Sequence, residues 1–351
     1  MKKLFSALKG PVAGVALSLA VCAGLLALLG ESPYVLLEAL QSTLFTSFGL
    51  GYTLFYATPL IFTGLAVAVC FHCGLFNIGA EGQLYVGSVG IIVIGSLFPN
   101  LPGALALTFG VAAAFLFGGL WGGIAGFLKA KRGSHEVIVT ILLNFVGIAL
   151  ANYLILYPLR NQTVQNPETV ELSAPYFLPT LFESTGLFES TPVNLALLLA
   201  VLTACFMFFF LFRTAWGYEL RAVGASNRAS EFAGISVGRN TLLAMFIGGG
   251  LAGMVGVNEV MGHQHKLVEG FSPQYGFTGI AVALLARNHP IGILLSAVLF
   301  GALHNSAREI EFLSDKVSKE LSLVLQGLII AFVASHYLLE NTLKRRKKGA
   351  A

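Results

Sequence analysis

The sequence has 351 residues, of which 56% are hydrophobic and 11% are charged, and its mean hydropathy is +0.80. Soluble domains carry roughly a quarter charged residues, so this composition excludes a soluble enzyme and indicates an integral membrane protein. The formal net charge is +4, from 21 Lys and Arg against 17 Asp and Glu. This balance gives no support to nucleic-acid binding, and the placement of the charges matters more than their sum.

Apolar runs long enough to cross a bilayer recur along the whole chain. They predict an all-α, polytopic membrane helical bundle that forms one transmembrane domain over residues 1–351. The first run is read as a retained helix rather than a cleaved signal peptide, because nine more follow it. The eighth run is too short to cross a bilayer alone. The ten predicted segments are 11–30, 43–70, 78–98, 101–128, 137–156, 193–212, 240–257, 277–286, 291–306 and 321–339.

The positions of Lys and Arg predict the orientation of the bundle. With the N-terminus in the cytoplasm, sixteen of the 21 basic residues fall on the cytoplasmic side. The even number of spans returns the C-terminus to the same side. Segment 158–191, which contains several prolines, then forms an external loop, and the basic segment 213–239 forms a cytoplasmic loop.

Two segments interrupt the helical pattern at membrane depth. Residues 74–83 place three glycines, an asparagine and a glutamate at the start of the third span, and residues 270–276 precede the short eighth span. Irregular backbone at this depth is tolerated only where protein buries it or where it lines a cavity. The two halves of the bundle start on opposite sides and each contains one break, which indicates an inverted-topology repeat.

The first break supplies candidate pathway residues. We expect Asn77 to be the N-cap of the third span, with Glu81 in the first turn near the positive end of the helix dipole. Two interpretations stay open, a purely structural cap or a place on a translocation pathway, because an ionisable group inside a span is costly. The candidate pathway residues are Asn77, Glu81, Gln83, Asn144 and Phe277.

Other patterns are interpreted as structural. Glycines spaced by four, at 118, 122 and 126 and again at 249 and 253, predict close helix packing. Cys70 and Cys73 have C-x-x-C spacing but no second pair, and they are read as buried thiols rather than a metal or redox site. His263 and His265 are weak evidence for a metal site, and we expect a solvated loop there.

The sequence also limits the catalytic chemistry. Residues 234–238 match the G-x-S-x-G string of hydrolases, but they precede a membrane span rather than joining a strand to a helix, so the match is attributed to chance. No Gly-Lys pair occurs, and the chain therefore lacks a phosphate-binding P-loop. Any ATP hydrolysis would belong to another polypeptide.

The cytoplasmic segment 216–235 is the most informative part of the chain. Asn227 as N-cap and Gly234 as C′ residue predict a helix of under two turns, which cannot be stable alone. It is either a linker on the membrane surface or a short helix presented to a cytoplasmic partner.

At this segment a family resemblance becomes explicit. RAVGASNRASEFAGI (221–235) resembles the coupling segment of ABC importer permeases in the branched-chain amino acid, ribose and nucleoside family. GLFNIGAEGQL (74–84) resembles the nucleoside, or simple-sugar, branch of that family, while KAKRGSHEVIVTILLN (129–144) and GFTGIAVALLARNHPIG (276–292) are similar to further family elements. The sequence departs from the family at 287–289, where Arg-Asn-His replaces small residues, and at Cys73.

The resemblance implies a permease subunit of an ATP-driven importer for nucleosides or related small polar solutes such as simple sugars. This chain would bind no cofactor, and ATP and Mg would bind to partner ATPase subunits. The other implied partners are a second, related but non-identical permease and an extracytoplasmic substrate-binding protein, at a bacterial cytoplasmic membrane with both termini inside. The implied ATPase-coupling residues are Glu219, Arg221, Gly224, Asn227, Arg228, Ala229, Glu231 and Gly234.

The alternative function is an ion-coupled secondary transporter of a small polar solute. Such a transporter needs paired ionisable groups near the middle of the membrane. Beyond Glu81, we expect the spans to offer almost none. The sequence therefore favours the importer permease.

Overall fold

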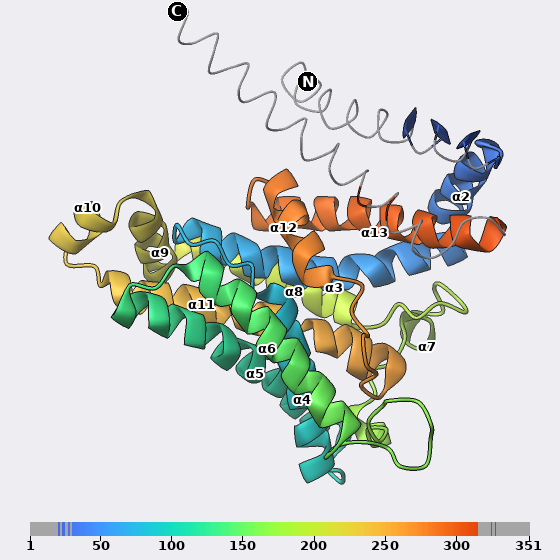
Figure 1. The fold of residues 1–351 in the computed structure, drawn as a ribbon, viewed down its shortest axis with the longest axis horizontal. Coiled ribbons are helices and arrows are strands. Elements are labelled where there is room, and N and C mark those ends of the chain that lie inside the picture. The colour runs from blue at the N-terminus through green and yellow to red at the C-terminus, as the bar shows by residue number, and fades with distance from the viewer. Residues whose placement is uncertain are drawn as a thin grey trace, which may run out of the picture. The chain divides into compact units, whose positions relative to one another are not determined.

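The computed structural model describes residues 30–314 continuously, together with positions 20, 21, 23, 24, 27, 28, 324 and 327. Most of the first predicted span and nearly all of the tenth lie outside the described residues. Within the described part, seven helices are long and apolar enough to cross a membrane. The prediction of an all-α polytopic bundle is confirmed (Figure 1).

The second to ninth predicted spans each correspond to a helix, whereas helix Tyr34–Phe45 was not predicted. In chain order they are α2 (Tyr34–Phe45), α3 (Ser47–His72), α4 (Ala80–Leu97), α5 (Gly103–Arg132), α6 (Glu136–Leu156), the 3-10 turn η1 (Ala174–Tyr176), α7 (Leu181–Thr185), α8 (Ala196–Arg213), α9 (Ala215–Ala225), α10 (Asn227–Phe232), α11 (Val237–Gly253), the π-helix η2 (Val257–Gln264), α12 (Tyr275–Leu285) and α13 (Pro290–Leu313). The short eighth span is confirmed as α12, which has 11 residues. The seventh span is longer than predicted, because η2 extends it to 28 residues, Val237–Gln264.

The chain forms two compact units. One comprises residues 1–56 and 299–351, and its described part contains α2, the start of α3 and the end of α13. There, Asn305 Nδ2 donates to the carbonyl of Gly49 at 3.0 Å, and the Arg308 guanidinium lies 3.9 Å from the Tyr52 ring centroid. The other unit, residues 57–298, contains every candidate site residue.

Small residues hold the centre of this second unit together. Helices α4, α5, α6 and α11 lie side by side (Figure 1). A Cβ added to Gly249 on α11 would meet the Cα of Gly122 on α5 at 3.0 Å, and a Cβ on Gly253 would collide with the Ala114 backbone. The predicted glycine stripes are therefore confirmed as the contact that lets α5 and α11 approach closely.

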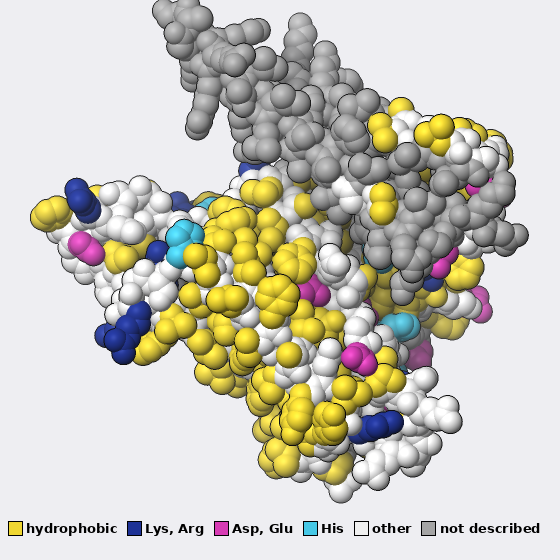
Figure 2. Space-filling model, viewed as in Figure 1, with side chains coloured by type: hydrophobic (Ala, Val, Ile, Leu, Met, Phe, Trp, Pro, Cys, Tyr) yellow, Lys and Arg dark blue, Asp and Glu magenta, His cyan; other side chains and the backbone are white. Residues whose placement is uncertain are grey.

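Apolar and basic side chains occupy different regions of the molecular surface. Figure 2 shows hydrophobic side chains covering much of the visible face, and Lys and Arg side chains gathered at the end that carries α9 and α10. The last turn of α5 contributes to that end through Lys129, Lys131 and Arg132. This distribution is typical of a bundle whose apolar flank lies in lipid.

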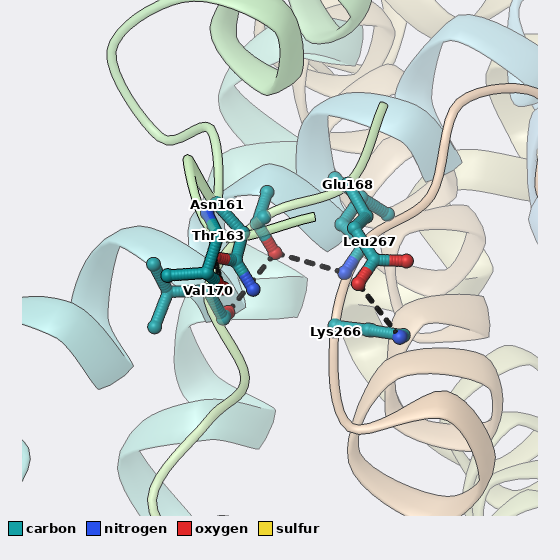
Figure 3. Close-up of polar contacts among 7 residues, drawn as sticks. Asn161, Thr163, Glu168, Val170, Lys266 and Leu267 are labelled. Carbon is teal, nitrogen blue, oxygen red and sulfur yellow. Dashed lines mark hydrogen bonds and ion pairs between the residues drawn. The ribbon is translucent and has the colours of Figure 1, made fainter. Parts of the chain in front are cut away.

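The long connection 158–191 packs on the segment that follows η2 (Figure 3). Lys266 Nζ lies 2.8 Å from Glu168 Oε1, while the amide of Leu267 donates to Thr169 Oγ1 at 3.0 Å. The amide of Thr169 in turn donates to the Leu267 carbonyl at 3.0 Å. The connection is thus anchored as a cap on one end of the unit.

Candidate translocation and coupling sites

The first predicted break forms a buried polar network, which we call the polar seam: Asn77, Glu81, Gln83, Thr140 and Asn144. All five side chains are buried. Asn77 Nδ2 donates to Gln83 Oε1 at 3.0 Å, and Gln83 Nε2 donates to Asn77 Oδ1 at 3.2 Å. This reciprocal amide pair joins the connection before α4 to the first turn of α4.

The prediction that Asn77 is the N-cap of the third span is wrong. The N-cap is Gly79, and no side chain caps α4. The helix starts later than the sequence indicates, because Asn77 Oδ1 accepts from the Gly79 amide at 2.9 Å in a local turn. Asn77 therefore organises the connection itself.

Helix α6 satisfies the backbone of the break. Asn144 Nδ2 donates to the carbonyl of Ile78, and Asn144 Oδ1 accepts from the amide of Gly82, both at 2.8 Å. Thr140 Oγ1 accepts from the Ile78 amide at 3.3 Å. Buried backbone groups at membrane depth need such partners, so Asn144 has a structural role as well as a place in the seam.

The two predicted breaks meet at Glu81. Glu81 Oε2 accepts from the backbone amide of Gly276 at 2.7 Å, at the N-terminus of α12. A Cβ on Gly276 would collide with the Glu81 backbone. Gln274 precedes this helix with a φ of 65°, which marks the sharp entry of the chain into α12. Phe277 is adjacent but 42% exposed, and it lies outside the seam.

The sequence analysis missed a second buried carboxylate, Glu259. It lies in the π-helix η2 with an exposed fraction of 4%, and it accepts from Asn258 Nδ2 at 3.2 Å. The Tyr275 side chain at the start of α12 also hydrogen-bonds to Glu259. Glu259 is thus one further ionisable group inside a span, and it was not counted because η2 extends the seventh span beyond its predicted end at residue 257.

The Cys, His and Ser residues of the sequence patterns described above lie in structural contacts within the folded chain. Cys70 Sγ lies 3.4 Å from the Ala244 carbonyl, and burial raises the pKa of the Cys73 thiol, which follows α3, to about 12. His265 stacks on Phe177 with the ring centroids 3.7 Å apart, so it does not occupy a freely solvated loop. Ser236 caps α11 by accepting from the Arg239 amide at 3.4 Å.

Residues 213–239, the coupling segment, contain two helices. The predicted short helix is confirmed as α10, but its N-cap is Ser226, whose hydroxyl accepts from the Ala229 amide at 3.3 Å. The choice of Asn227 is wrong, since the chain is still extended at Ser226 and becomes helical at the next residue. Gly234 has a φ of 78°, as its predicted C′ position requires. Helix α9 was not predicted.

Two of the eight candidate coupling residues are half-buried, and the other six, Gly224 among them, are exposed. Glu219 and Arg221 on α9 are half-buried: Glu219 Oε2 accepts from Asn240 Nδ2 at 3.1 Å, and Arg221 Nε donates to the Leu211 carbonyl at 3.0 Å. Phe232 at the end of α10 is 94% exposed, and sequence reasoning missed it. The residues that lie exposed on or beside α10 are Asn227, Arg228, Ala229, Glu231 and Gly234.

Gly224 fixes α9 to the bundle. A Cβ at this position would meet the amide nitrogen of Gly74 at 2.9 Å and the carbonyl carbon of Cys73 at 3.0 Å. Gly74 itself has a φ of 71°. A cavity of about 420 Å³ lies beside this contact, lined by residues that include Lys129, Glu136 and Glu231. The coupling segment is thus docked on the end of α3, and residues of α5 and α6 line the adjoining cavity.

Comparison with known proteins now decides the family. The model of the family described as "Branched-chain amino acid transport system / permease component" matches residues 49–334. The chain belongs to this family. It is a multi-pass membrane permease of an ABC transport system, and such systems pair a permease with ATPase and substrate-binding partners. The ion-coupled alternative is therefore set aside.

Three relatives are similar over most of their length. The guanosine ABC transporter permease protein NupP of Bacillus subtilis is 37% identical, covering 100% of both chains. The nucleoside ABC transporter permease protein NupB of Lactococcus lactis is 34% identical over 87% of this chain and 84% of its own. The glucose ABC transporter permease protein TsgB13 of Haloferax volcanii is 34% identical over 88% and 81%.

Proposed function

We propose that this permease imports nucleosides, using ATP hydrolysed by separate partner subunits. The observation that carries the coupling part of the proposal is the geometry of α10, a short capped helix that projects Phe232 with 94% of its surface exposed. An apolar side chain so exposed at a basic end of the molecule is suited to burial in a partner protein.

The substrate class rests on the relatives and on the seam. Two of the three relatives above are named for guanosine or nucleosides and one for glucose, all neutral solutes rich in hydroxyl groups. The seam offers amides and a hydroxyl, which both donate and accept hydrogen bonds, and its carboxylate is engaged by Gly276. Asn77, Glu81, Gln83 and Asn144 would line the route when it opens, with Phe277 at its edge.

The proposed assembly contains four kinds of subunit. ATPase subunits, which themselves bind ATP and Mg, contact the coupling segment, and this chain binds no cofactor. A related, non-identical permease completes the channel, while a substrate-binding protein delivers the solute to the side of segment 158–191. Both termini and the coupling segment lie in the cytoplasm of a bacterial cell, in accord with the basic residues at 129–132 and 344–348.

The substrate is tested by uptake in cells that lack their own nucleoside permeases and express this chain with its partner subunits. We expect uptake of labelled guanosine that excess adenosine reduces and excess glucose does not. The uptake should disappear when the P-loop lysine of the partner ATPase is replaced. Uptake of glucose without guanosine would contradict the nucleoside assignment.

The coupling contact is tested with Phe232→Ser and with charge reversal at Arg228. Both should lower uptake and ATP hydrolysis together by weakening ATPase binding, measured as the ATPase co-purified with the permease. Phe182→Ser on α7 is the matched control, because Phe182 is also exposed, at 40%, but lies on segment 158–191. Normal uptake in the double variant Arg228→Glu, Glu231→Arg would argue against the contact.

A further inference from the structure

The short helix α12 ends in an unusual turn that is bonded to the helix. Arg287 and Asn288 have φ angles of 53° and 58°, values that residues other than glycine seldom adopt. The amide of Asn288 donates to the Ala283 carbonyl at 2.8 Å, and the amide of Arg287 donates to the Leu284 carbonyl at 3.0 Å. These bonds cap α12, so a displacement of the turn displaces the end of the helix with it.

The end of α3 and the end of α8 hold this turn. His72 Nε2 lies 3.0 Å from the Asn288 carbonyl oxygen, which can only accept, so Nε2 carries the hydrogen. The His72 ring contacts the Phe212 ring edge-on with centroids 5.6 Å apart, and His289 stacks on Phe212 at 5.7 Å. Phe212 thus lies against two histidines, one of which belongs to the turn.

The coupling segment reaches the same aromatic ring. The Arg221 guanidinium of α9 lies 5.2 Å from the Phe212 centroid, within cation–π range. Arg221 Nε also donates to the carbonyl of Leu211, next to Phe212, at 3.0 Å. Because the Arg221 side chain makes both contacts, a shift of α9 would act on Phe212.

The opposite end of α12 is held by the polar seam, through Glu81 and the Gly276 amide. The 11 residues of α12 span about 16 Å at 1.5 Å per residue. The helix is too short to cross the membrane, yet each of its ends is tied to a different functional part of the molecule. Such an element can convey a displacement without changing its own internal hydrogen bonds.

We propose that Arg221, Phe212 and His72 form a latch that couples movement of α9 to α12, and that α12 conveys this movement to Glu81 and the seam. The proposal rests on the proposed ATP-driven function and names positioning residues for it. Arg221 acts through Phe212, and His72 acts through the Asn288 carbonyl. None of the three needs to touch the solute.

The test uses the whole transporter, with its ATPases and binding protein, in liposomes. Arg221→Ala and His72→Leu should each lower the solute taken up per ATP hydrolysed by about 2- to 30-fold, the range of coupling effects from residues that contact neither ligand. Arg221→Lys should restore part of the ratio. The double variant Arg221→Ala, His72→Leu should take up little less solute per ATP than either single variant, because both changes break the same linkage.

A second readout reports α12 directly. A thiol reagent should modify the cysteine of Thr278→Cys at a rate that ATP changes in the parent, and Arg221→Ala should abolish that ATP dependence. Protein without the added cysteine gives the background. If Arg221→Ala fails to assemble, the same measurement is made on Arg221→Gln, which removes the cation with a smaller loss of packing.

The outcomes separate the two proposals. Absence of ATP-dependent uptake by the parent transporter would refute the proposed function. Uptake in the parent, with an unchanged ratio and unchanged ATP dependence of labelling in the Arg221 and His72 variants, would refute the latch alone. A loss of uptake and ATP hydrolysis in equal proportion, without rescue by Arg221→Lys, would also refute it and assign these residues to stability.

Discussion

Replacement of Gly224 by alanine is expected to disturb the docking of α9 while leaving the helix itself folded. The added Cβ would lie 2.9 Å from the Gly74 amide nitrogen and 3.0 Å from the Cys73 carbonyl carbon, and it would collide with the His72 carbonyl oxygen. All three are backbone atoms, so no flexible side chain can yield. Alanine also favours a helix over glycine by about 1 kcal/mol, so α9 itself should stay helical.

The expected magnitude follows from the size of the overlap. Ordinary contact distances are restored only if α9 moves by about 1 Å, and overpacking of this kind costs about 1–3 kcal/mol. That free energy corresponds to about 5- to 150-fold in the equilibrium between docked and displaced α9. We therefore expect coupled uptake to fall by about 5- to 150-fold.

The assay is ATP-driven uptake in liposomes, measured beside the far-ultraviolet circular dichroism and the yield of the purified permease. The matched control is Gly123→Ala, where the nearest atom to a new Cβ, on Phe246, is 3.7 Å away. This control should retain full uptake. Uptake by Gly224→Ala equal to that of the control would show that the contact between α9 and the end of α3 is unnecessary for coupling.

Three further outcomes follow from the same geometry. Glu81→Gln keeps an oxygen that can accept from the Gly276 amide, so this variant should retain most uptake. Glu81→Leu should lose uptake, and full uptake by that variant would remove the contact from the mechanism. Gly249→Leu should reduce the yield of monodisperse protein, since the side chain would enter the α5 backbone, and a normal yield would contradict the packing. In intact cells an impermeant thiol reagent should label the cysteine of Ser190→Cys but not that of Ser226→Cys, and the reverse pattern would invert the orientation.

The spans could be predicted from sequence because hydropathy reports directly on burial in lipid. The apolar runs at 78–98 and 137–156 became α4 and α6, whose ends differ from the predicted ones by at most two residues. The glycines at 118, 122, 249 and 253 likewise predicted a close approach that depends only on their spacing. These features are local or periodic, and they need no knowledge of the partner element.

The seam could be only half predicted. Asn77, Glu81 and Gln83 were visible as polar residues in a break, but the acceptor of Gly276 lies 195 positions earlier in the chain. Asn144 and Glu259 act through tertiary partners as well, and Glu259 was hidden because a π-helix prolonged the seventh span. Pairings of this kind depend on how the helices cross, which periodicity does not encode.

The coupling segment illustrates the same limit at smaller scale. Residues 215–225 were assigned to a cytoplasmic loop, although they form α9, where Gly217 and Gly224 are required for close packing: a Cβ on Gly217 would meet the Leu211 Cα at 2.7 Å. Glycine has a low intrinsic helix propensity, whereas tertiary contact requires these two glycines inside a helix. Helix α9 was therefore missed, while α10, with its local cap signals, was found.

The balance of contacts at α12 suits an element that must shift readily. A buried hydrogen bond to a carboxyl group contributes about 1.5–3 kcal/mol, and a cation–π contact contributes about 0.5–2 kcal/mol. The bond from Gly276 to Glu81 holds one end of α12, and the contact of Arg221 with Phe212, which reaches the other end only through His72 and His289, is of comparable strength. Coupling free energies between distant sites are typically 1–3 kcal/mol. A change at α9 of that size is therefore enough to alter the position of α12, provided that the helix moves as one body.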